Sequence, residues 1–125
     1  MKSINKVLIV VHNRIVAFDI KNICERLGLL CSYGSPNTDL LVCVKNNSAG
    51  LLIMDIIIGR DQNLLDEAEI ICNSLKIPII FFTTVPGHNI KKERLAGRCI
   101  FLTLPFIQED LSNSINYLEK KYIYY

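Results

Sequence analysis

Residues 7–14 read VLIVVHNR, an apolar run rich in β-branched residues that stops at His12 and Asn13. A short run that is apolar at every position is typical of a strand buried on both faces of a parallel sheet. In open parallel sheets, ligands bind outside the carboxyl ends of the strands. We therefore expect the functional site at the carboxyl end of this run, near His12 and Asn13.

Four similar runs follow, and stretches with helical periodicity lie between them. The predicted strands are Lys6–Val11, Leu29–Tyr33, Leu51–Asp55, Pro78–Thr83 and Cys99–Leu104. The predicted helices are Val16–Leu27, Ser35–Lys45, Leu65–Leu75, Asn89–Ala96 and Leu111–Tyr122, and the fourth shows only weak periodicity. Ser35 and Pro36 fit the N-cap and the first position of the second helix, and Gly28 fits the end of the first.

This alternation of strands and helices predicts one α/β domain over residues 1–125. Right-handed crossovers in a domain of this size favour a flavodoxin-like, doubly wound (βα)5 fold, with a five-stranded parallel sheet in the order 2-1-3-4-5. In that order the functional crevice lies at the carboxyl ends of the first, third, fourth and fifth strands. The residues there are Val11-His12-Asn13, Asp55, Thr83-Thr84 and Leu104-Pro105.

The composition argues against several classes of protein. Half of the 125 residues are apolar, 21% are charged and the net charge is +2, which describes a globular chain and not a disordered one. The pairs Lys91-Lys92 and Lys120-Lys121 form no basic stripe, so we expect no nucleic-acid partner. No apolar run approaches the ~20 residues of a membrane span, so we expect no membrane association.

Cysteine usage bears on the compartment. The five cysteines have neither a CxxC motif nor metal-ligand spacing, and each lies in an apolar segment. Without a signal peptide, this pattern predicts a reducing, cytoplasmic location.

Asp55 is the only acid at the predicted strand ends, and it closes an apolar run of four residues. A carboxylate at this place serves as a nucleophile or ligand, or as a structural acceptor for backbone N–H groups of the next loop. The position alone does not decide between these roles. Thr83 offers a hydroxyl to a group bound beside Asp55, or is a β-branched residue that ends a strand.

The order and spacing of five segments resemble a response regulator receiver domain of two-component signalling, from about Lys6 to Lys121. The segments are VLIV at 7–10, LLIMD at 51–55, DEAEII at 66–71, IPIIFFTT at 77–84 and FLTLPF at 101–106. The resemblance implies that Asp55 accepts a phosphoryl group from the phosphohistidine of a kinase, and that Thr83 hydrogen-bonds that group. It also implies that Phe101 is the switch aromatic and that the backbone carbonyl of Ile57 helps to bind Mg²⁺.

The chain departs from the family's pattern at the residues that handle charge. Two adjacent acids hold Mg²⁺ in the family, where this chain has Val11 and His12. Valine offers no ligand, and an imidazole suits softer metals than Mg²⁺. The family's lysine before the Pro-Phe pair is here Leu104. We therefore expect a weak or absent Mg²⁺ site with Asp55 as its one carboxylate.

These losses bear on the chemistry of the site, because phosphoryl transfer depends on positioning and neutralising the phosphoryl oxygens. Removing one electrostatic partner of this kind typically costs roughly 3–4 kcal/mol of transition-state stabilisation. Ordinary Mg²⁺-dependent phosphorylation of Asp55 is accordingly not expected.

His12 allows three interpretations, which we rank in order of preference. The first is a histidine at a strand end whose ring hydrogen-bonds locally or faces water. The second is a partner for Asp55 on the neighbouring strand, which would partly replace the missing cation. The third is a ligand, together with Asp55, for Zn²⁺ or another transition metal, which requires further ligands that the sequence does not indicate.

The favoured hypothesis is a stand-alone, atypical receiver domain in a phosphorelay-type network. It would not be an enzyme, and would act through contacts with a histidine kinase or another signalling protein. The sequence ends shortly after the fifth predicted helix, so we expect no output domain. The contact face, which would also serve a homodimer, comprises the fourth helix, fifth strand and fifth helix, with Asn89, Arg94, Phe101, Pro105 and the helix from Glu109 onward.

Three alternatives stay open at this point. The first is a conventional receiver in which Asp55 is still phosphorylated and water completes a poor Mg²⁺ site. The second is a flavodoxin-like module for a nucleotide or another small ligand, although His12-Asn13-Arg14 lacks the glycine of a phosphate loop. The third is an enzyme, for which His12 with Asp55 is the one visible nucleophile–base pair.

Overall fold

The structure is a computed structural model that describes residues 4–35, 39–56, 62–83 and 99–123. The sheet has the strand order β2-β1-β3-β4-β5, and every neighbouring pair is parallel, as predicted for a flavodoxin-like fold. In chain order, the described elements are β1 (Lys6–Val10), α1 (Arg14–Arg26), β2 (Leu30–Tyr33), α2 (Leu40–Asn46), β3 (Leu51–Asp55), α3 (Gln62–Ser74), β4 (Ile79–Thr83), β5 (Cys99–Thr103) and α4 (Gln108–Ile123).

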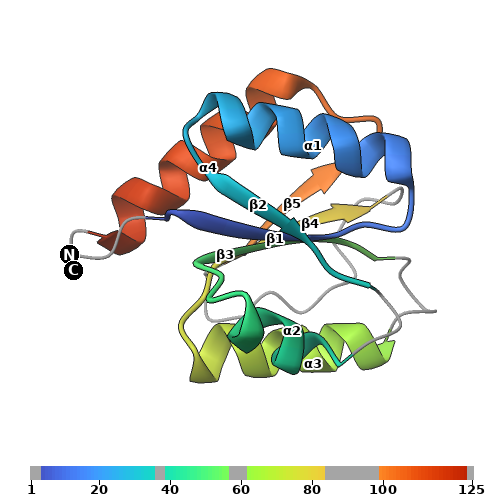
Figure 1. Cartoon of the computed structure of the whole chain (residues 1–125), viewed down its shortest axis with the longest axis vertical. Helices are drawn as coiled ribbons and strands as arrows, with labels where there is room; N and C mark the ends of the chain where they lie inside the picture. Colours follow the sequence, from blue (N-terminus) through green and yellow to red (C-terminus); the bar gives the residue numbers. More distant parts are fainter. Residues whose placement is uncertain (1–3, 36–38, 57–61, 84–98, 124–125) are drawn as a thin grey trace.

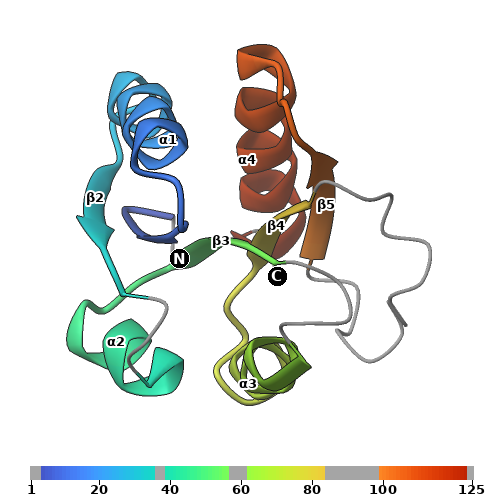
Figure 2. The ribbon, with the colours of Figure 1, turned by 90° about the vertical axis from the view of Figure 1, so that its right-hand side faces the viewer.

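Helices cover both faces of the sheet (Figure 1). α1 and α4 lie on one face, and α2 and α3 lie on the other. Figure 2, turned by 90°, shows the same two layers, with β2 and β5 at the two edges of the sheet. The apolar character of the strands at every position follows from this double cover, because both faces of each central strand are buried.

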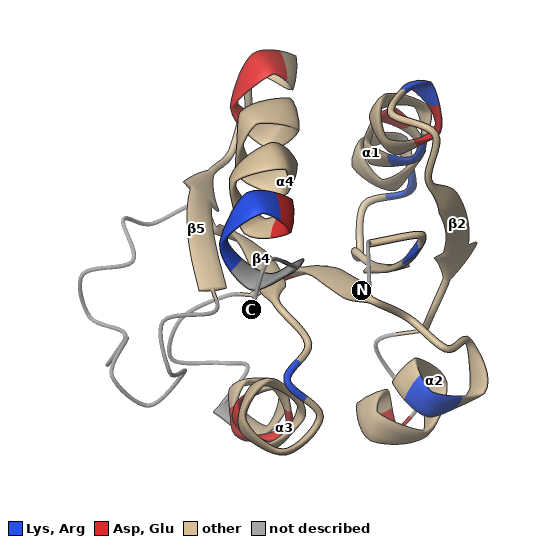
Figure 3. Ribbon diagram, turned by 90° about the vertical axis from the view of Figure 1, so that its left-hand side faces the viewer, with Lys and Arg blue, Asp and Glu red and all other residues tan. Residues whose placement is uncertain are grey.

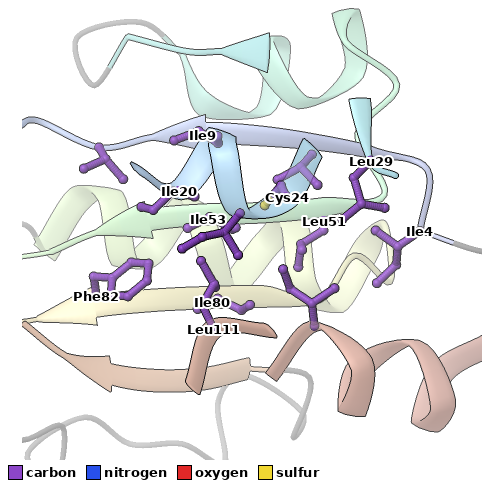
Figure 4. Close-up of a cluster of buried hydrophobic side chains, with 14 of the residues drawn as sticks. Ile4, Ile9, Ile20, Cys24, Leu29, Leu51, Ile53, Ile80, Phe82 and Leu111 are labelled. Carbon is purple, nitrogen blue, oxygen red and sulfur yellow. The ribbon is translucent and has the colours of Figure 1, made fainter. Parts of the chain in front are cut away.

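Two clusters of buried side chains fill the space between the sheet and the helices. β4 shows how one strand serves both, since Phe82 belongs to the cluster under α1 and α4 and Phe81 to the cluster under α2 and α3. Figure 4 shows the first cluster, in which side chains of three neighbouring strands meet those of two helices. The labelled members of those strands and helices are Ile9, Leu51, Ile53, Ile80, Phe82, Ile20, Cys24 and Leu111.

α1 ends where the sequence predicted. Gly28 has φ +84, a left-handed conformation that glycine adopts without the strain of a side chain. Its N–H donates to the carbonyl of Glu25 at 3.0 Å, which satisfies one of the unpaired carbonyls at the helix end.

α2 begins later than the sequence predicted, and the assignment of Ser35 as its N-cap is wrong. The N-cap is Asp39, whose side chain accepts hydrogen bonds from the N–H groups of Leu41 and Val42 at 3.0 and 3.3 Å. Glu67 of α3 accepts a further bond from the first N–H of the helix at 3.0 Å. Two carboxylates thus accept hydrogen bonds from three backbone N–H groups at this helix end. A single serine side chain before a proline would not satisfy all three donors.

The N-cap of α2 can be tested by substitution. Replacing Asp39 by alanine is expected to lower the free energy of unfolding by about 1 kcal/mol, because two backbone donors lose their acceptor. Asp19, exposed in the middle of α1, is the matched control, and its replacement by alanine should change stability by less than about 0.5 kcal/mol. Urea denaturation measures both variants, and an equal loss in the two would show that Asp39 does not cap α2.

Charge is distributed along α4 in the direction that its dipole favours (Figure 3). Glu109 and Asp110 lie in its first turn, and Lys120 and Lys121 lie in its last. Acids near the positive N-terminal end and bases near the C-terminal end each stabilise a helix modestly. These charges therefore stabilise α4.

Two further expectations concern the chain as a whole. No helix in the described part of the chain combines the length and the apolar character that crossing a membrane requires. The five cysteines all fall within the described ranges, and none of them forms a disulfide.

The predicted helix at residues 89–96 lies outside the described residues.

Candidate functional site

The sheet brings the ends of β1 and β3 together. Val10 of β1 is the register partner of Met54 of β3. The residues that follow them, Val11 and Asp55, therefore lie at the same level of the sheet. Asp55 is therefore beside the turn between β1 and α1, where His12 stands. Both side chains are partly exposed, with 44% of His12 and 18% of Asp55 accessible.

His12 contacts the carboxylate of Asp55 in two ways. Its ring Nδ1 lies 2.7 Å from Asp55 Oδ1. Its backbone N–H donates to both carboxylate oxygens, at 3.2 Å each. Because an ionised carboxylate only accepts hydrogen bonds, Nδ1 is the donor in the short contact, in the neutral and in the protonated ring alike. One residue thus occupies both oxygens of the site's carboxylate.

Asn13 fixes the position of this turn, a role that the sequence interpretation missed. Its side chain accepts from the N–H groups of Ile15 and Val16 at 2.9 and 3.1 Å, which makes it the N-cap of α1. His12 is consequently held between the end of a buried strand and a capped helix. An asparagine directly before a helical stretch is the sequence signal that would have found this cap.

The contact corresponds to the second interpretation of His12 and not to the first. The ring reaches a residue 43 positions away and no neighbour in sequence, as expected for a partner of Asp55. The transition-metal interpretation requires at least a third ligand. Within the ranges that the structure describes, no three His, Cys, Asp or Glu side chains come together as a metal site would require.

The described residues of the site do not fit Mg²⁺. Val11 is buried in the cluster under α1 and α4 and offers no oxygen ligand from its side chain. The two oxygens of Asp55 are already hydrogen-bonded to His12. Mg²⁺ demands oxygen ligands in near-octahedral geometry, and these residues offer it a single carboxylate whose two oxygens already accept hydrogen bonds from His12. Ile57, the expected backbone ligand, lies outside the described residues.

Thr83 and Leu104 meet at the carboxyl ends of β4 and β5. Phe82 is the register partner of Asp55, so Thr83 lies one residue beyond it on the strand next to the site. Thr83 is buried, and its carbonyl accepts from the N–H of Leu104 at 2.8 Å. The role of the Thr83 hydroxyl stays a prediction.

Leu104, at the family's lysine position, is half-buried and packs against the cluster under α1 and α4. The peptide bond to Pro105 is cis. The aliphatic side chain therefore adds to the core and brings no cation to Asp55.

Phe101, the expected switch aromatic, stacks on Phe81 of the neighbouring strand. Their ring centroids are 4.9 Å apart and the rings are inclined by 12°. The Phe101 side chain is half-buried and packs against the cluster under α2 and α3. Stacking holds the ring in this structure, and its role as a switch stays a prediction.

The sequence matches no protein-family model and no curated protein. Solved structures do match. The receiver domain of the Francisella response regulator 1452 has a TM-score of 0.74 and 22% identity, over 94% of this chain and 98% of that one. The chemotaxis response regulator CheY4 of Vibrio cholerae has a TM-score of 0.74 and 15% identity, over 93% and 99%.

A third similar structure is the signal receiver domain of a modulated diguanylate cyclase from Desulfovibrio desulfuricans G20. Its TM-score is 0.72 at 20% identity, over 98% of this chain and 99% of that one. At these identities the likeness shows the fold, which is the flavodoxin-like fold of receiver domains.

Proposed function

We propose that this chain is a receiver-type domain of two-component signalling in which His12, and not Mg²⁺, occupies the carboxylate of Asp55. The likeness of its fold to receiver domains supports the signalling role. The observation that carries the proposal is the double contact of His12, through Nδ1 at 2.7 Å and through its backbone N–H at 3.2 Å. A donor on the carboxylate partly replaces the metal and lysine of the family, since it hydrogen-bonds the same oxygens.

We place the activity of the domain in protein–protein contacts and not in catalysis. Its partner is a histidine kinase or another signalling protein of the cytoplasm. In the labels of Figure 1, the family's contact face corresponds to β5 and α4, together with residues such as Asn89 and Arg94 that lie outside the described ranges. Ile107, just before α4, and Tyr117, within it, are 64% and 51% exposed.

The small-ligand alternative has less support. A surface concavity on α1 is lined by Asn22, Glu25 and Arg26, which belong to the C-terminal half of that helix. Because α1 runs antiparallel to the strands, this concavity lies away from their carboxyl ends, where ligands of such folds bind.

The function of the site is tested by titrating Mg²⁺ and following amide chemical shifts around Asp55. The wild-type chain is expected to show no saturable shift at millimolar Mg²⁺, because His12 occupies the carboxylate. The His12→Asp variant removes the ring and adds an oxygen ligand, so its affinity for Mg²⁺ should be at least about tenfold higher.

The His12→Asn variant is the matched control, because it removes the ring without adding a carboxylate. It should bind Mg²⁺ more weakly than the His12→Asp variant. Saturation of the wild type, with a beryllofluoride adduct that disappears in Asp55→Asn, would instead establish a conventional receiver.

A further inference from the structure

The contact with Asp55 distinguishes the two ring nitrogens of His12. Nδ1 carries the hydrogen, because it lies 2.7 Å from a carboxylate oxygen that only accepts. In the neutral ring the lone pair is then on Nε2. The side chain is 44% exposed, and no hydrogen bond found among the described residues uses Nε2. The nitrogen with the lone pair is therefore the one that a partner can reach.

A carboxylate that orients an imidazole through Nδ1 makes Nε2 a better nucleophile or base. Here the same carboxylate is also held by the backbone N–H of His12, at 3.2 Å to each oxygen. The next residue, Asn13, caps α1 and fixes the turn. The ring is consequently oriented before any partner arrives, which lowers the entropic cost of a reaction at Nε2.

From this geometry we propose that His12 Nε2 is a phospho-acceptor site and that Asp55 is its positioning residue. The donor is a compound with a transferable phosphoryl group on nitrogen or on an acyl oxygen. The inference deepens the proposed function and rests on it for the source of the phosphoryl group. It moves the accepting atom from the carboxylate of Asp55 to the imidazole that covers it.

The step is a displacement at phosphorus. The lone pair of Nε2 forms a bond to phosphorus, and the bond from phosphorus to the donor breaks, with its electron pair staying on the leaving nitrogen or carboxylate oxygen. Nδ1 keeps its hydrogen, so the ring becomes a phosphorylated imidazolium. Asp55 Oδ1, 2.7 Å from Nδ1, stabilises the positive charge that develops there.

This acceptor suits the residues that the chain has. A neutral nitrogen is repelled less by an anionic phosphoryl group than a carboxylate is, so the loss of the family's lysine at Leu104 matters less for His12 than for Asp55. α1 begins at Arg14, two residues after His12, and has no acid in its first turn. The positive end of this helix favours a negative group beside it.

The test incubates the full chain with acetyl phosphate and, separately, with phosphoramidate, and locates any adduct by mass spectrometry. A phosphate on imidazole nitrogen is stable to alkali and labile to acid, whereas an acyl phosphate on aspartate is labile to alkali. We expect one alkali-stable, acid-labile phosphate on His12.

Three variants make the assignment specific. The His12→Gln variant should lose the adduct, and His88→Gln, which changes the other histidine of the sequence, should keep it. Asp55→Asn keeps a hydrogen-bond acceptor but loses the charge, so the adduct should form more slowly by on the order of tenfold. If Asp55 had only a structural role, the Asp55→Asn variant would form the adduct at the wild-type rate. Circular dichroism establishes that each variant is folded.

Two results would overturn the proposal, and they differ in what else they affect. An alkali-labile adduct on Asp55 that forms in the wild type and persists in His12→Gln would overturn this proposal. It would also overturn the proposed function, in which His12 occupies the carboxylate of Asp55. No adduct on the folded wild type with either donor would overturn the phospho-acceptor role alone. The absence of Mg²⁺ binding would then still support a receiver-type domain that works by contact.

Discussion

Replacing Phe82 by alanine is expected to lower the free energy of unfolding by about 3–5 kcal/mol. Phe82 is fully buried in β4, and its ring packs against that of Phe106 with centroids 4.9 Å apart. Truncation removes the transfer free energy of the ring and leaves a cavity between the sheet and its helices. Since small domains are stable by only about 5–15 kcal/mol, the variant should be close to the limit of folding.

Thermal and urea denaturation, followed by circular dichroism, measure this loss. The melting temperature should fall by roughly 10–20 °C. Phe18 is the matched control, because it is the same residue type on the outer side of α1 and is 55% exposed. Phe18→Ala should change stability by less than about 0.5 kcal/mol. Equal losses in the two variants would contradict the assignment of Phe82 to the core.

A second large effect is expected at alkaline pH. Burial raises the pKa of Cys24 from 9.0 to about 12, and the neighbouring Cys31 contributes in the same direction. Between these values the unfolded chain has released the proton of Cys24 while the folded chain still holds it. The unfolded state is therefore favoured, and the contribution of this thiol to stability is complete below pH 9 and lost as the pH rises toward about 12.

The size of this effect follows from proton linkage. The free energy of unfolding should fall by on the order of a few kcal/mol between pH 9 and about 12 because of the raised pKa of Cys24. The measurement is the difference between the wild type and Cys24→Ala, because the ionisations that both proteins share then cancel. The wild type should lose stability more steeply above pH 9. Parallel curves for the two proteins would show that Cys24 keeps no raised pKa in the fold.

The arrangement of strands and helices could be predicted because periodicity reports burial directly. Five apolar runs located the five strands to within one residue at each end, and the right-handed crossovers indicated their order. The start of α2 could not be predicted, because Glu67 reaches it from α3, far along the chain. A Ser-Pro pair is a good local signal, but Asp39 with this distant carboxylate provides the better cap.

The candidate site could be located but not described from the sequence. Strand ends placed His12 and Asp55 near each other, and the sequence identified their contact as one of three interpretations. The preference for a locally bonded or solvated ring was wrong, because the register of β1 and β3 sets the carboxylate within 2.7 Å of Nδ1. Side-chain distance depends on register and on the Asn13 cap together, and neither is visible in periodicity.

The two residues that make the central contact of the site, His12 and Asp55, lie outside the core. Neither buried cluster includes them, although Asp55 is the last residue of β3 and His12 follows β1, and both strands are buried along most of their length. A substitution at this rim alters the chemistry while the packing beneath it is kept, whereas a substitution inside β3 or β4 threatens folding itself. Selection can therefore act on the two separately. Over evolutionary time, a fold of this kind can outlast the reaction for which it was first selected.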